Sequence, residues 1–270
     1  MQDFDFLATI ARQAGKAILE IYDTDFLVQH KADHSPLTLA DTRSHRIITD
    51  SLRARYPEIP VLSEEGKTVP FETRKTWDRF WLVDPLDGTK EFVKRNGEFT
   101  VNIALIEKSQ PIAGVIYIPV QDRLFFADVR EGCWEESNGA RKRLTVAQWP
   151  LHAPVRIVRS RSHPSPGLEK ILSFIPEHEI INRGSSLKFC AVAGGEADFY
   201  PRFGPTWEWD TAAGHAIVTA AGGVMVDLCG RPFTYNKENL LNGPFLVSSS
   251  QHWLANSGVL EAASGLCEKS

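Results

Sequence analysis

Hydrophobic side chains near the start of the chain recur every three or four residues, which is the period of an amphipathic α-helix. They are Phe6, Leu7, Ile10, Ala14, Ile18 and Ile21. A second helix is expected over residues 38–56, where Ile47, Ile48 and Leu52 share one apolar face. The chain therefore begins with two helices, each of which needs a hydrophobic surface to cover.

Short apolar runs between polar segments then predict a series of β-strands. These runs cover residues 60–62, 81–83, 99–106, 112–118, 124–128 and 132–136. The strand at 81–83 is expected to stop at Asp84-Pro85, because proline fixes φ and has no N–H to donate. A helix is expected to start at Thr89, and the polar residues 66–75 are expected to form a surface loop.

Strands and helices alternate in the second part of the chain, which favours an α/β arrangement there. The expected strands cover residues 155–158, 179–181, 197–200 and 224–227, and the expected helices cover 168–174, 186–194 and 210–221. Prolines bound the best linker candidate, residues 149–154. We therefore expect an N-terminal α+β half, residues 1–152, and a C-terminal α/β half, residues 153–270.

The composition is that of a globular protein, with 43% hydrophobic and 24% charged residues. A net charge of -4 argues against a nucleic-acid polymer as partner, because such partners select a basic surface. The sequence shows neither a signal peptide nor the roughly 18 apolar residues of an integral membrane segment. We expect a monomer in the cytoplasm, either free or peripheral to the inner face of the cell membrane. Its four cysteines are expected to be reduced thiols.

Carboxylates follow two of the predicted strands and precede one helix. Asp84 and Asp87 flank the turn after strand 81–83, Glu64 and Glu65 follow strand 60–62, and Asp210 stands before the helix at 210–221. Each position has an ordinary alternative: a turn, a solvated loop or a helix N-cap. Gathered at one place, these acids would resist ionisation unless a cation such as Mg²⁺, which prefers oxygen ligands, joined them. Two such ions can promote attack of water on a phosphate ester.

Two segments of the sequence, Asp84-Pro85-Leu86-Asp87-Gly88-Thr89 and Trp209-Asp210-Thr211-Ala212-Ala213-Gly214, resemble the signatures of the inositol monophosphatase superfamily. The longer run DPLDGTKEFVKRNGEFTVNIALI (84–106) and the segments 184–190 and 200–205 resemble one branch of it, the 3'(2'),5'-bisphosphate nucleotidases of the bacterial CysQ type. The resemblance extends from about residue 5 to about residue 250. It implies a layered α+β and α/β sandwich of the inositol monophosphatase and fructose-1,6-bisphosphatase type, in the order αβαβα.

The resemblance also implies a site for two or three Mg²⁺ ions between the two halves. The implied metal ligands are Glu64, Asp84, the backbone carbonyl of Leu86, Asp87 and Asp210. Asp41 and Thr89 are implied to orient the attacking water, with help from Glu65. Gly88 and Thr89 are implied to donate backbone N–H groups to the phosphate.

Substrate recognition is implied to come from the second half of the chain. The implied residues are His163, Ser185, Ser186, Lys188 and Arg202. Lysine and arginine suit a second phosphate group, because both carry a positive charge and several donors. The alternatives are a solvated Lys188 and a purely structural His163.

The function implied by the resemblance is magnesium-dependent hydrolysis of adenosine 3',5'-bisphosphate to AMP and phosphate, by direct attack of water and with lithium inhibition. Its implied place is sulfur metabolism, where this nucleotide is a by-product of sulfate assimilation and sulfotransfer. The alternatives are an inositol monophosphatase or sugar-bisphosphate phosphatase of the same superfamily, and a regulatory binding protein that keeps the fold. The segment from Gly184 to Arg202 is expected to distinguish the substrates, because it should contact the part of the substrate that does not react.

Overall fold

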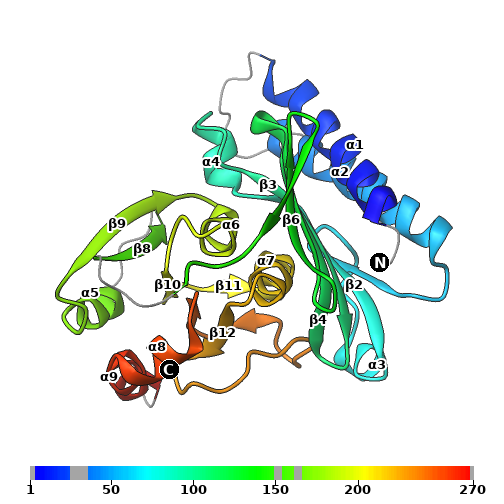
Figure 1. Ribbon diagram of the computed structural model, residues 1–270. Coiled ribbons are helices and arrows are strands. Elements are labelled where there is room, and N and C mark those ends of the chain that lie inside the picture. The colour runs from blue at the N-terminus through cyan, green and yellow to red at the C-terminus, as the bar shows by residue number, and fades with distance from the viewer. Residues whose placement is uncertain (1–3, 25–35, 149–153, 161–165, 268–270) are drawn as a thin grey trace.

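Two helices and a seven-stranded sheet form the first two layers of the structure, a computed structural model that describes residues 4–24, 36–148, 154–160 and 166–267. Helices α1 (Phe4–Tyr22) and α2 (Pro36–Arg55) lie side by side on one face of the sheet (Figure 1). Both helices were predicted, and the structure confirms them. Their contacts with the sheet explain the helical period of the hydrophobic residues.

The seven strands follow one another across this sheet in chain order. They are β1 (Val61–Ser63), β2 (Arg79–Asp87), β3 (Thr100–Glu107), β4 (Gln110–Ile118), β5 (Arg123–Asp128), β6 (Gly132–Ser137) and β7 (Ala140–Leu144). Strands β1 and β2 pair in parallel, and every later pair is antiparallel. Antiparallel neighbours need only short turns between them, which accounts for the compact meander from β2 to β7.

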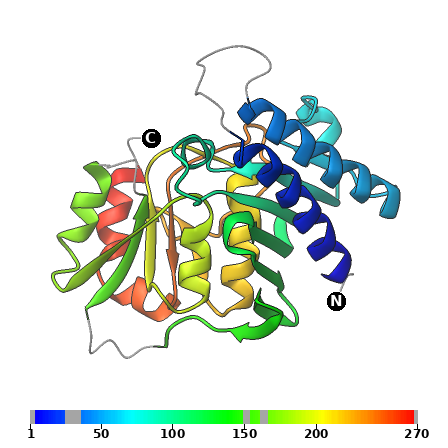
Figure 2. The same cartoon turned by 90° about the horizontal axis from the view of Figure 1, so that it is seen from above.

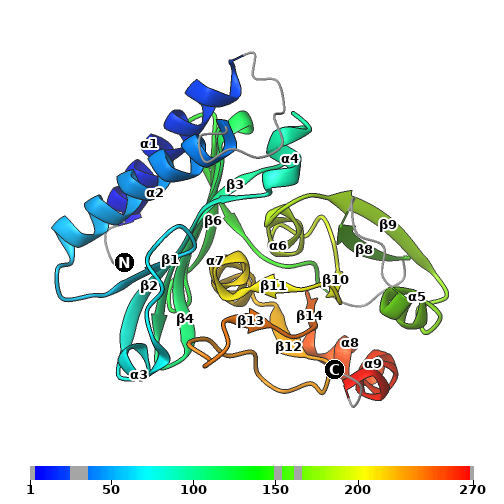
Figure 3. The same ribbon diagram turned by 180° about the vertical axis from the view of Figure 1, so that it is seen from behind.

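Helices α6 (Leu187–Ala193) and α7 (Glu208–Ala220) fill the middle layer, between this sheet and a second one (Figure 3). The second sheet has the order β12-β14-β10-β8-β9. Its strands are β8 (Val155–Ser160), β9 (His178–Arg183), β10 (Phe199–Arg202), β12 (Val224–Asp227) and β14 (Phe245–Ser248). Helices α5 (Pro166–Leu172), α8 (Gln251–Asn256) and α9 (Val259–Cys267) cover its outer face (Figure 2).

The alternation of side chains along β2 shows how one strand serves two layers. Phe80 and Leu82 pack in the hydrophobic cluster that contains α6, α7 and the inner face of the second sheet. Trp81 and Val83 point the other way, into the cluster formed with α1 and α2. Since successive side chains of a strand face opposite sides, a buried sheet needs an apolar residue at nearly every position. The predicted αβαβα sandwich is therefore confirmed.

One predicted strand end is wrong. Strand β2 does not stop at Asp84-Pro85 but continues to Asp87, with a register shift in its pairing to β3 between Asp84 and Asp87. The irregularity accommodates Pro85, which cannot take part in a regular ladder as a donor. The Ser44 hydroxyl donates to the Pro85 carbonyl at 2.7 Å, and the Leu86 N–H donates to Asp84 Oδ1 at 3.0 Å. These bonds satisfy backbone groups that the shifted ladder leaves unpaired.

Three further expectations need correction or fall outside the description. The segment 66–75 is not entirely loop, because α3 (Phe71–Arg74) forms within it. Cys229 is disulfide-bonded, so the expectation of four reduced thiols is wrong, whereas Cys133 and Cys190 are free and buried.

The expected linker falls largely on residues 149–153, which lie outside the described residues. The division into two halves stays a prediction; one hydrophobic cluster packs residues of both sheets together.

Candidate active site

Three aspartates from distant parts of the chain meet at one place. Asp84 and Asp87 lie at the irregular end of β2, and Asp210 lies in the first turn of α7. One carboxylate oxygen from each lies within 4.8 Å of the other two. Asp84 is the most enclosed, with 1% of its surface exposed. Asp210, which follows Asp87 by 123 positions in the chain, thus joins the two strand-end aspartates in an all-oxygen cluster, which suits a hard divalent cation.

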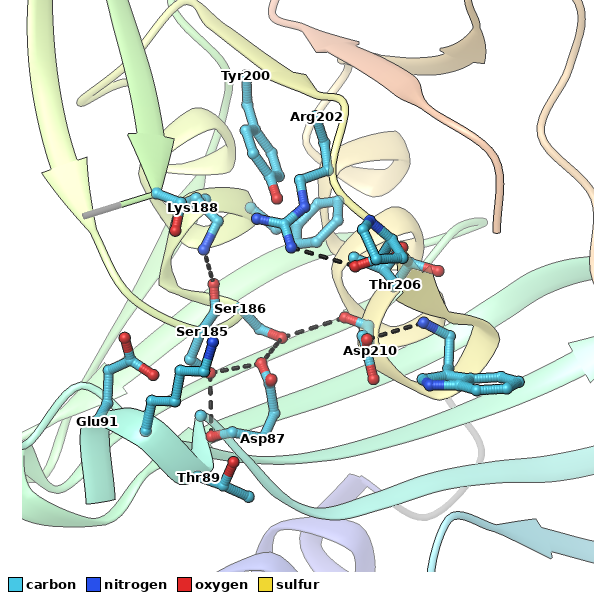
Figure 4. A pocket seen from close by; sticks show the side chains of 17 residues that line it. Asp87, Thr89, Glu91, Ser185, Ser186, Lys188, Tyr200, Arg202, Thr206 and Asp210 are labelled. Atoms are coloured by element: carbon cyan, nitrogen blue, oxygen red, sulfur yellow. Dashed lines mark hydrogen bonds between the residues drawn. The ribbon is translucent and has the colours of Figure 1, made fainter. Parts of the chain in front are cut away.

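Two serines hold Asp87 in this cluster (Figure 4). The Ser185 and Ser186 hydroxyls donate to Asp87 Oδ2 at 2.5 Å and 2.8 Å. The Ser186 oxygen in turn accepts a hydrogen bond from the Asn102 side-chain amide at 2.8 Å. The segment before α6 is therefore tied to the ends of β2 and β3. Both serines were predicted as substrate-binding residues, and that role stays a prediction beside this structural one.

Asp210 is not the N-cap of α7. The N-cap is Trp207, whose backbone N–H donates to Asp210 Oδ2 at 2.8 Å. Asp210 therefore occupies the third helical position, from which a carboxylate can reach back to the start of the helix. Its other oxygen remains available to the cluster, so helix capping and metal binding are compatible here.

Four acids of the site, Asp41, Glu64, Asp84 and Asp210, have raised pKa values when no cation is present. Burial, with added repulsion from Glu64, Asp87, Asp210 and Asp41, raises the pKa of Asp84 well above its usual range. Burial first, and then neighbouring acids, raises the pKa of Asp210 to about 8 and that of Asp41 to about 8. Glu64 stands at the exposed rim, yet partial loss of solvation raises its pKa to about 7, against the effect of a hydrogen bond with Asp84. A bound cation would reverse these shifts.

The cluster opens into a pocket of about 420 Å³. Its lining residues are Asp87, Gly88, Thr89, Lys90, Glu91, Ser160, Ser185, Ser186, Lys188, Phe189, Tyr200, Arg202, Pro205, Thr206, Trp207, Asp210 and Thr211. The residues come from the end of β2 and the turn after it, α4 (Thr89–Val93), the end of β8, the segment before α6 and the start of α6, and the stretch from β10 to α7. One end of the pocket is therefore acidic, and the rest holds several donors and cations.

Three cations line this pocket, Lys90, Lys188 and Arg202, and Figure 4 labels the last two. Lys188 is only 5% exposed, and its ammonium donates to the Ser185 carbonyl. Burial lowers the pKa of Lys188 to about 8, although nearby Asp87 opposes that shift. The Arg202 guanidinium donates to the carbonyls of Gly204 and Pro205, each at 3.2 Å. A solvated Lys188, the alternative considered from the sequence, is excluded by this burial.

The turn between β2 and α4 depends on a glycine. Gly88 has φ of +94° and is the N-cap of α4, which begins at Thr89 as predicted. A Cβ on Gly88 would lie 3.1 Å from both the Glu98 carbonyl oxygen and the Ser185 Cβ. Glycine is therefore required at this position for its conformation and for its close neighbours.

The other residues that the sequence assigned to the site differ in their positions relative to the aspartate cluster. Asp41 is buried at 7% exposure on α2, and the charges of Glu64 and Glu65 contribute to its raised pKa, so these three acids are neighbours. Leu86 lies on β2 between Asp84 and Asp87. His163 lies outside the described residues. The assigned roles of these residues stay predictions.

Sequence reasoning missed several residues that hold the site together. Asn102 and Thr100 are buried polar residues in an otherwise apolar strand, with exposures of 1% and 0%. They pair in register with Asp84 and Asp87 on β2. That break in the apolar run was the available signal, because a buried polar side chain needs a partner. Glu98, which accepts from the Gly184 N–H at 2.8 Å, gave no such signal because its neighbours are polar.

The comparisons with known proteins agree with this geometry. A sequence model of the Inositol monophosphatase family matches residues 2–264. The 3'(2'),5'-bisphosphate nucleotidase CysQ of Escherichia coli K12 is 50% identical over 248 residues, which cover 90% of this chain and 98% of that one. The protein of the same name from Haemophilus influenzae is 35% identical and covers 90% of this chain and 91% of its own.

Solved structures give the same answer. The crystal structure of CysQ from Bacteroides thetaiotaomicron, described as a bacterial member of the inositol monophosphatase family, matches with a TM-score of 0.82 at 42% identity. The match covers 93% of this chain and 100% of that one. Inositol monophosphatase II from Staphylococcus aureus also gives a TM-score of 0.82, at 25% identity, over 100% of this chain and 97% of that one. On sequence, fold and the clustered aspartates together, the chain belongs to the inositol monophosphatase family.

Proposed function

We propose that this chain is a magnesium-dependent 3'(2'),5'-bisphosphate nucleotidase that hydrolyses adenosine 3',5'-bisphosphate to AMP and phosphate. The observation that carries the proposal is one pocket with two kinds of group. Asp87 and Asp210, which form a cluster with the buried Asp84, line one end, and Lys188 and Arg202 lie beyond them. The first set suits a cation at the reacting phosphate, and the second suits a phosphate that does not react. Relatives 35–50% identical to this chain carry the name of that activity.

The donor set fits Mg²⁺. Every side-chain donor in the cluster is a carboxylate oxygen, and mutual repulsion and burial raise the pKa of Asp84 in the absence of a counter-ion. Asp84, Asp87, Asp210, Glu64 and the carbonyl of Leu86 would hold the ions. When bound, Mg²⁺ lowers the pKa of water and stabilises the charge of the phosphoryl oxygens. A zinc site is disfavoured, because the cluster contains no histidine or cysteine.

The residues around the cluster supply binding and orientation. Asp41 and Thr89 would hold the attacking water, since Asp41 can accept its proton through a pKa of about 8. The N–H groups of Gly88 and Thr89 would bind the phosphoryl oxygens. Lys188, with a pKa lowered to about 8 by burial, would regain a full charge beside a second phosphate. Such a cationic end distinguishes a bisphosphate from a monophosphate.

The test is phosphate release from adenosine 3',5'-bisphosphate and from inositol 1-phosphate, measured side by side with Mg²⁺, with EDTA and with added Li⁺. We expect rapid release from the nucleotide, loss of activity with EDTA, and inhibition by Li⁺. Faster release from inositol 1-phosphate would keep the metal site and overturn the substrate. Release from neither would favour a binding protein that keeps the fold.

Lys188→Ala examines the substrate more closely. The variant should raise the KM for adenosine 3',5'-bisphosphate by about tenfold or more, because a charge-assisted hydrogen bond contributes about 1.5–3 kcal/mol. Its effect on a minimal ester such as p-nitrophenyl phosphate should be much smaller. Lys170→Ala, a change at a lysine of α5 outside the pocket lining, is the control. Equal losses on both substrates would contradict a role in binding the second phosphate.

A further inference from the structure

The pocket carries an aromatic surface that phosphate chemistry does not use. Phe189, Tyr200 and Trp207 are the aromatic residues among its lining. Phe189 and Tyr200 are each only 2% exposed, because they pack into the hydrophobic cluster between the sheets. Trp207 is 42% exposed. The indole of Trp207 therefore presents an open, flat apolar surface beside a polar site.

Three backbone contacts fix the position of Trp207. Its N–H donates to Asp210 Oδ2 at 2.8 Å, and its carbonyl accepts from Asn242 Nδ2 at 2.8 Å. It also pairs with Leu241 in the short antiparallel ladder of β11 (Thr206–Trp207) and β13 (Leu241–Asn242). The position of this residue is therefore fixed relative to the aspartate cluster.

The indole itself is supported from one side. Trp207 and Trp209 stack with ring centroids 5.3 Å apart and planes 12° apart. Trp209 is less exposed than Trp207 and packs against the central hydrophobic cluster. One face of the Trp207 ring is thus covered by a neighbour of the same shape, and the exposed part is left for a second flat ring.

The backbone around Trp207 is in contact with both the acidic and the cationic parts of the pocket. Asp210 is bonded directly to the Trp207 backbone. Arg202 is bonded to the carbonyl of Pro205, an exposed residue two positions before Trp207 that also lines the pocket. A ligand with a phosphate at the aspartates and another at the cations would carry its remaining, uncharged part along this wall.

We propose that Trp207 is the stacking platform for the nucleobase of the bisphosphate substrate. The inference rests on the proposed function and adds a subsite to it. A base on the indole would extend the Trp207–Trp209 stack to three rings. Stacking uses the flat face that all bases share, so this subsite selects for a base without reading which base it is. The contribution expected from one stacked base is about 5- to 150-fold in kcat/KM.

The experiment compares adenosine 3',5'-bisphosphate with 1-deoxyribose 3,5-bisphosphate, which keeps both phosphates and has no base. The quantity measured is the ratio of the two kcat/KM values, with Mg²⁺, for the wild type and for Trp207→Ala, Trp207→Leu and Trp207→Phe. We expect the ratio to fall about 5- to 150-fold in the alanine and leucine variants. Phenylalanine, which keeps a flat ring, should restore most of it. Phe174→Ala removes another exposed aromatic residue, 45% exposed and outside the pocket lining, and serves as the control.

Each outcome bears on a different part of the inference. A wild type that prefers the nucleotide, with a ratio unchanged in Trp207→Ala, overturns the platform and leaves the proposed function standing. A wild type that hydrolyses both compounds equally well also overturns it, because no base subsite then exists. A wild type active on neither compound removes the proposed function, and the subsite with it. If the alanine variant does not fold, Trp207→Leu gives the same comparison with an apolar side chain of greater bulk.

Discussion

At the scale of single residues, Ser186 does more than its predicted substrate contact would require. Its hydroxyl lies 2.8 Å from Asp87 Oδ2 and 3.2 Å from the Asp210 carbonyl oxygen, and it accepts from Asn102. Residues of β2, β3 and α7 therefore share one buried oxygen atom. A hydroxyl can accept and donate at once, which neither alanine nor valine can do.

Ser186→Ala tests this role. The change leaves the buried Asn102 amide without its acceptor and removes one of the two serine hydrogen bonds to Asp87, so we expect a loss of about 1–3 kcal/mol of stability. The Mg²⁺ concentration for half-maximal activity should rise as well, because a metal ligand loses its support. Urea unfolding and a Mg²⁺ titration measure the two effects. Ser264→Ala, on the exposed side of α9, is the matched control. Unchanged values in both assays would show that the serine is dispensable.

The raised pKa values predict an unusual pH dependence for the metal-free protein. Asp41 and Asp210, with pKa values raised to about 8, keep protons in the folded state that the unfolded chain has already released at neutral pH. The folded state then binds more protons, so stability falls as pH rises from about 6.5 to about 8. Burial lowers the pKa of His215 to about 4, so this residue makes a contribution of opposite sign, which ends as pH rises past its unfolded value near 6.5. Burial also lowers the pKa of Lys188 to about 8, so its opposing contribution begins only at the upper end of this window.

Tm measured in EDTA should therefore decrease across that window. With saturating Mg²⁺ the trend should weaken or reverse, because binding requires ionised ligands. Asp84→Asn replaces the most buried acid with a neutral side chain of the same shape, so it should raise Tm in EDTA and abolish turnover. A flat Tm in EDTA, or an active Asp84→Asn variant, would argue against the metal cluster.

At the scale of secondary-structure elements, α7 owes its position to the absence of a side chain on the facing sheet. A Cβ on Gly114 of β4 would lie 2.6 Å from the Ala213 carbonyl oxygen and 3.0 Å from its Cα. Both are backbone atoms, which cannot rotate away. Because α7 carries Asp210 in its first turn, the distance between helix and sheet also sets the depth of the aspartate in the site.

Gly114→Ala should push α7 away from β4. We expect a loss of about 1–3 kcal/mol from overpacking and a lower kcat, since Asp210 moves with the helix. Gly243→Ala is the matched control: a Cβ there meets nothing within 4 Å, and the position has no left-handed backbone angle. The measurements are the free energy of unfolding at equilibrium and the kcat of both variants. Equal, wild-type values for the two would mean that the helix tolerates the shift.

At the scale of the whole molecule, buried polar contacts join the edge of the first sheet to the segment before β13. Arg74 of α3 is 3% exposed and donates to the carbonyls of Lys237 and Glu238 and to Asn236 Oδ1. Glu208, fully buried at the start of α7, accepts from the backbone N–H groups of Asn236 and Lys237. This segment is thereby fixed between α3 and the helix that carries Asp210.

Arg74→Ala should be among the more destabilising changes on this side of the molecule. The change leaves several buried acceptors without a donor. We therefore expect the free energy of unfolding, measured in urea, to fall by about 3 kcal/mol or more. Arg130→Ala is the control, because that side chain is 75% exposed and its ion pair with Glu107 is long, at 3.7 Å. A surface pair of this kind contributes about 0–1 kcal/mol. Similar losses for the two variants would deny a special role to the buried arginine.

The sequence by itself determined most elements and the metal-site candidates. Periodicity located α1 and α2 because each covers a sheet with one face, and apolar runs located β3 to β6 because both sides of that sheet are covered. The motif around Asp84 pointed to acids that local geometry must bring close together, since only two residues lie between Asp84 and Asp87. These features depend on neighbours in the chain, which a sequence shows directly.

Tertiary structure decided what depends on distant partners. Strand β2 continues beyond Pro85 because its pairing with β3 resumes at Asp87, which is in register with Thr100. Asp210 sits inside α7 because Trp207, held by β13, became the cap. The exposure of that tryptophan beside the site follows from the same ladder. Local propensity cannot anticipate such choices, because their free energy comes from contacts that form only when the two sheets have packed around α7.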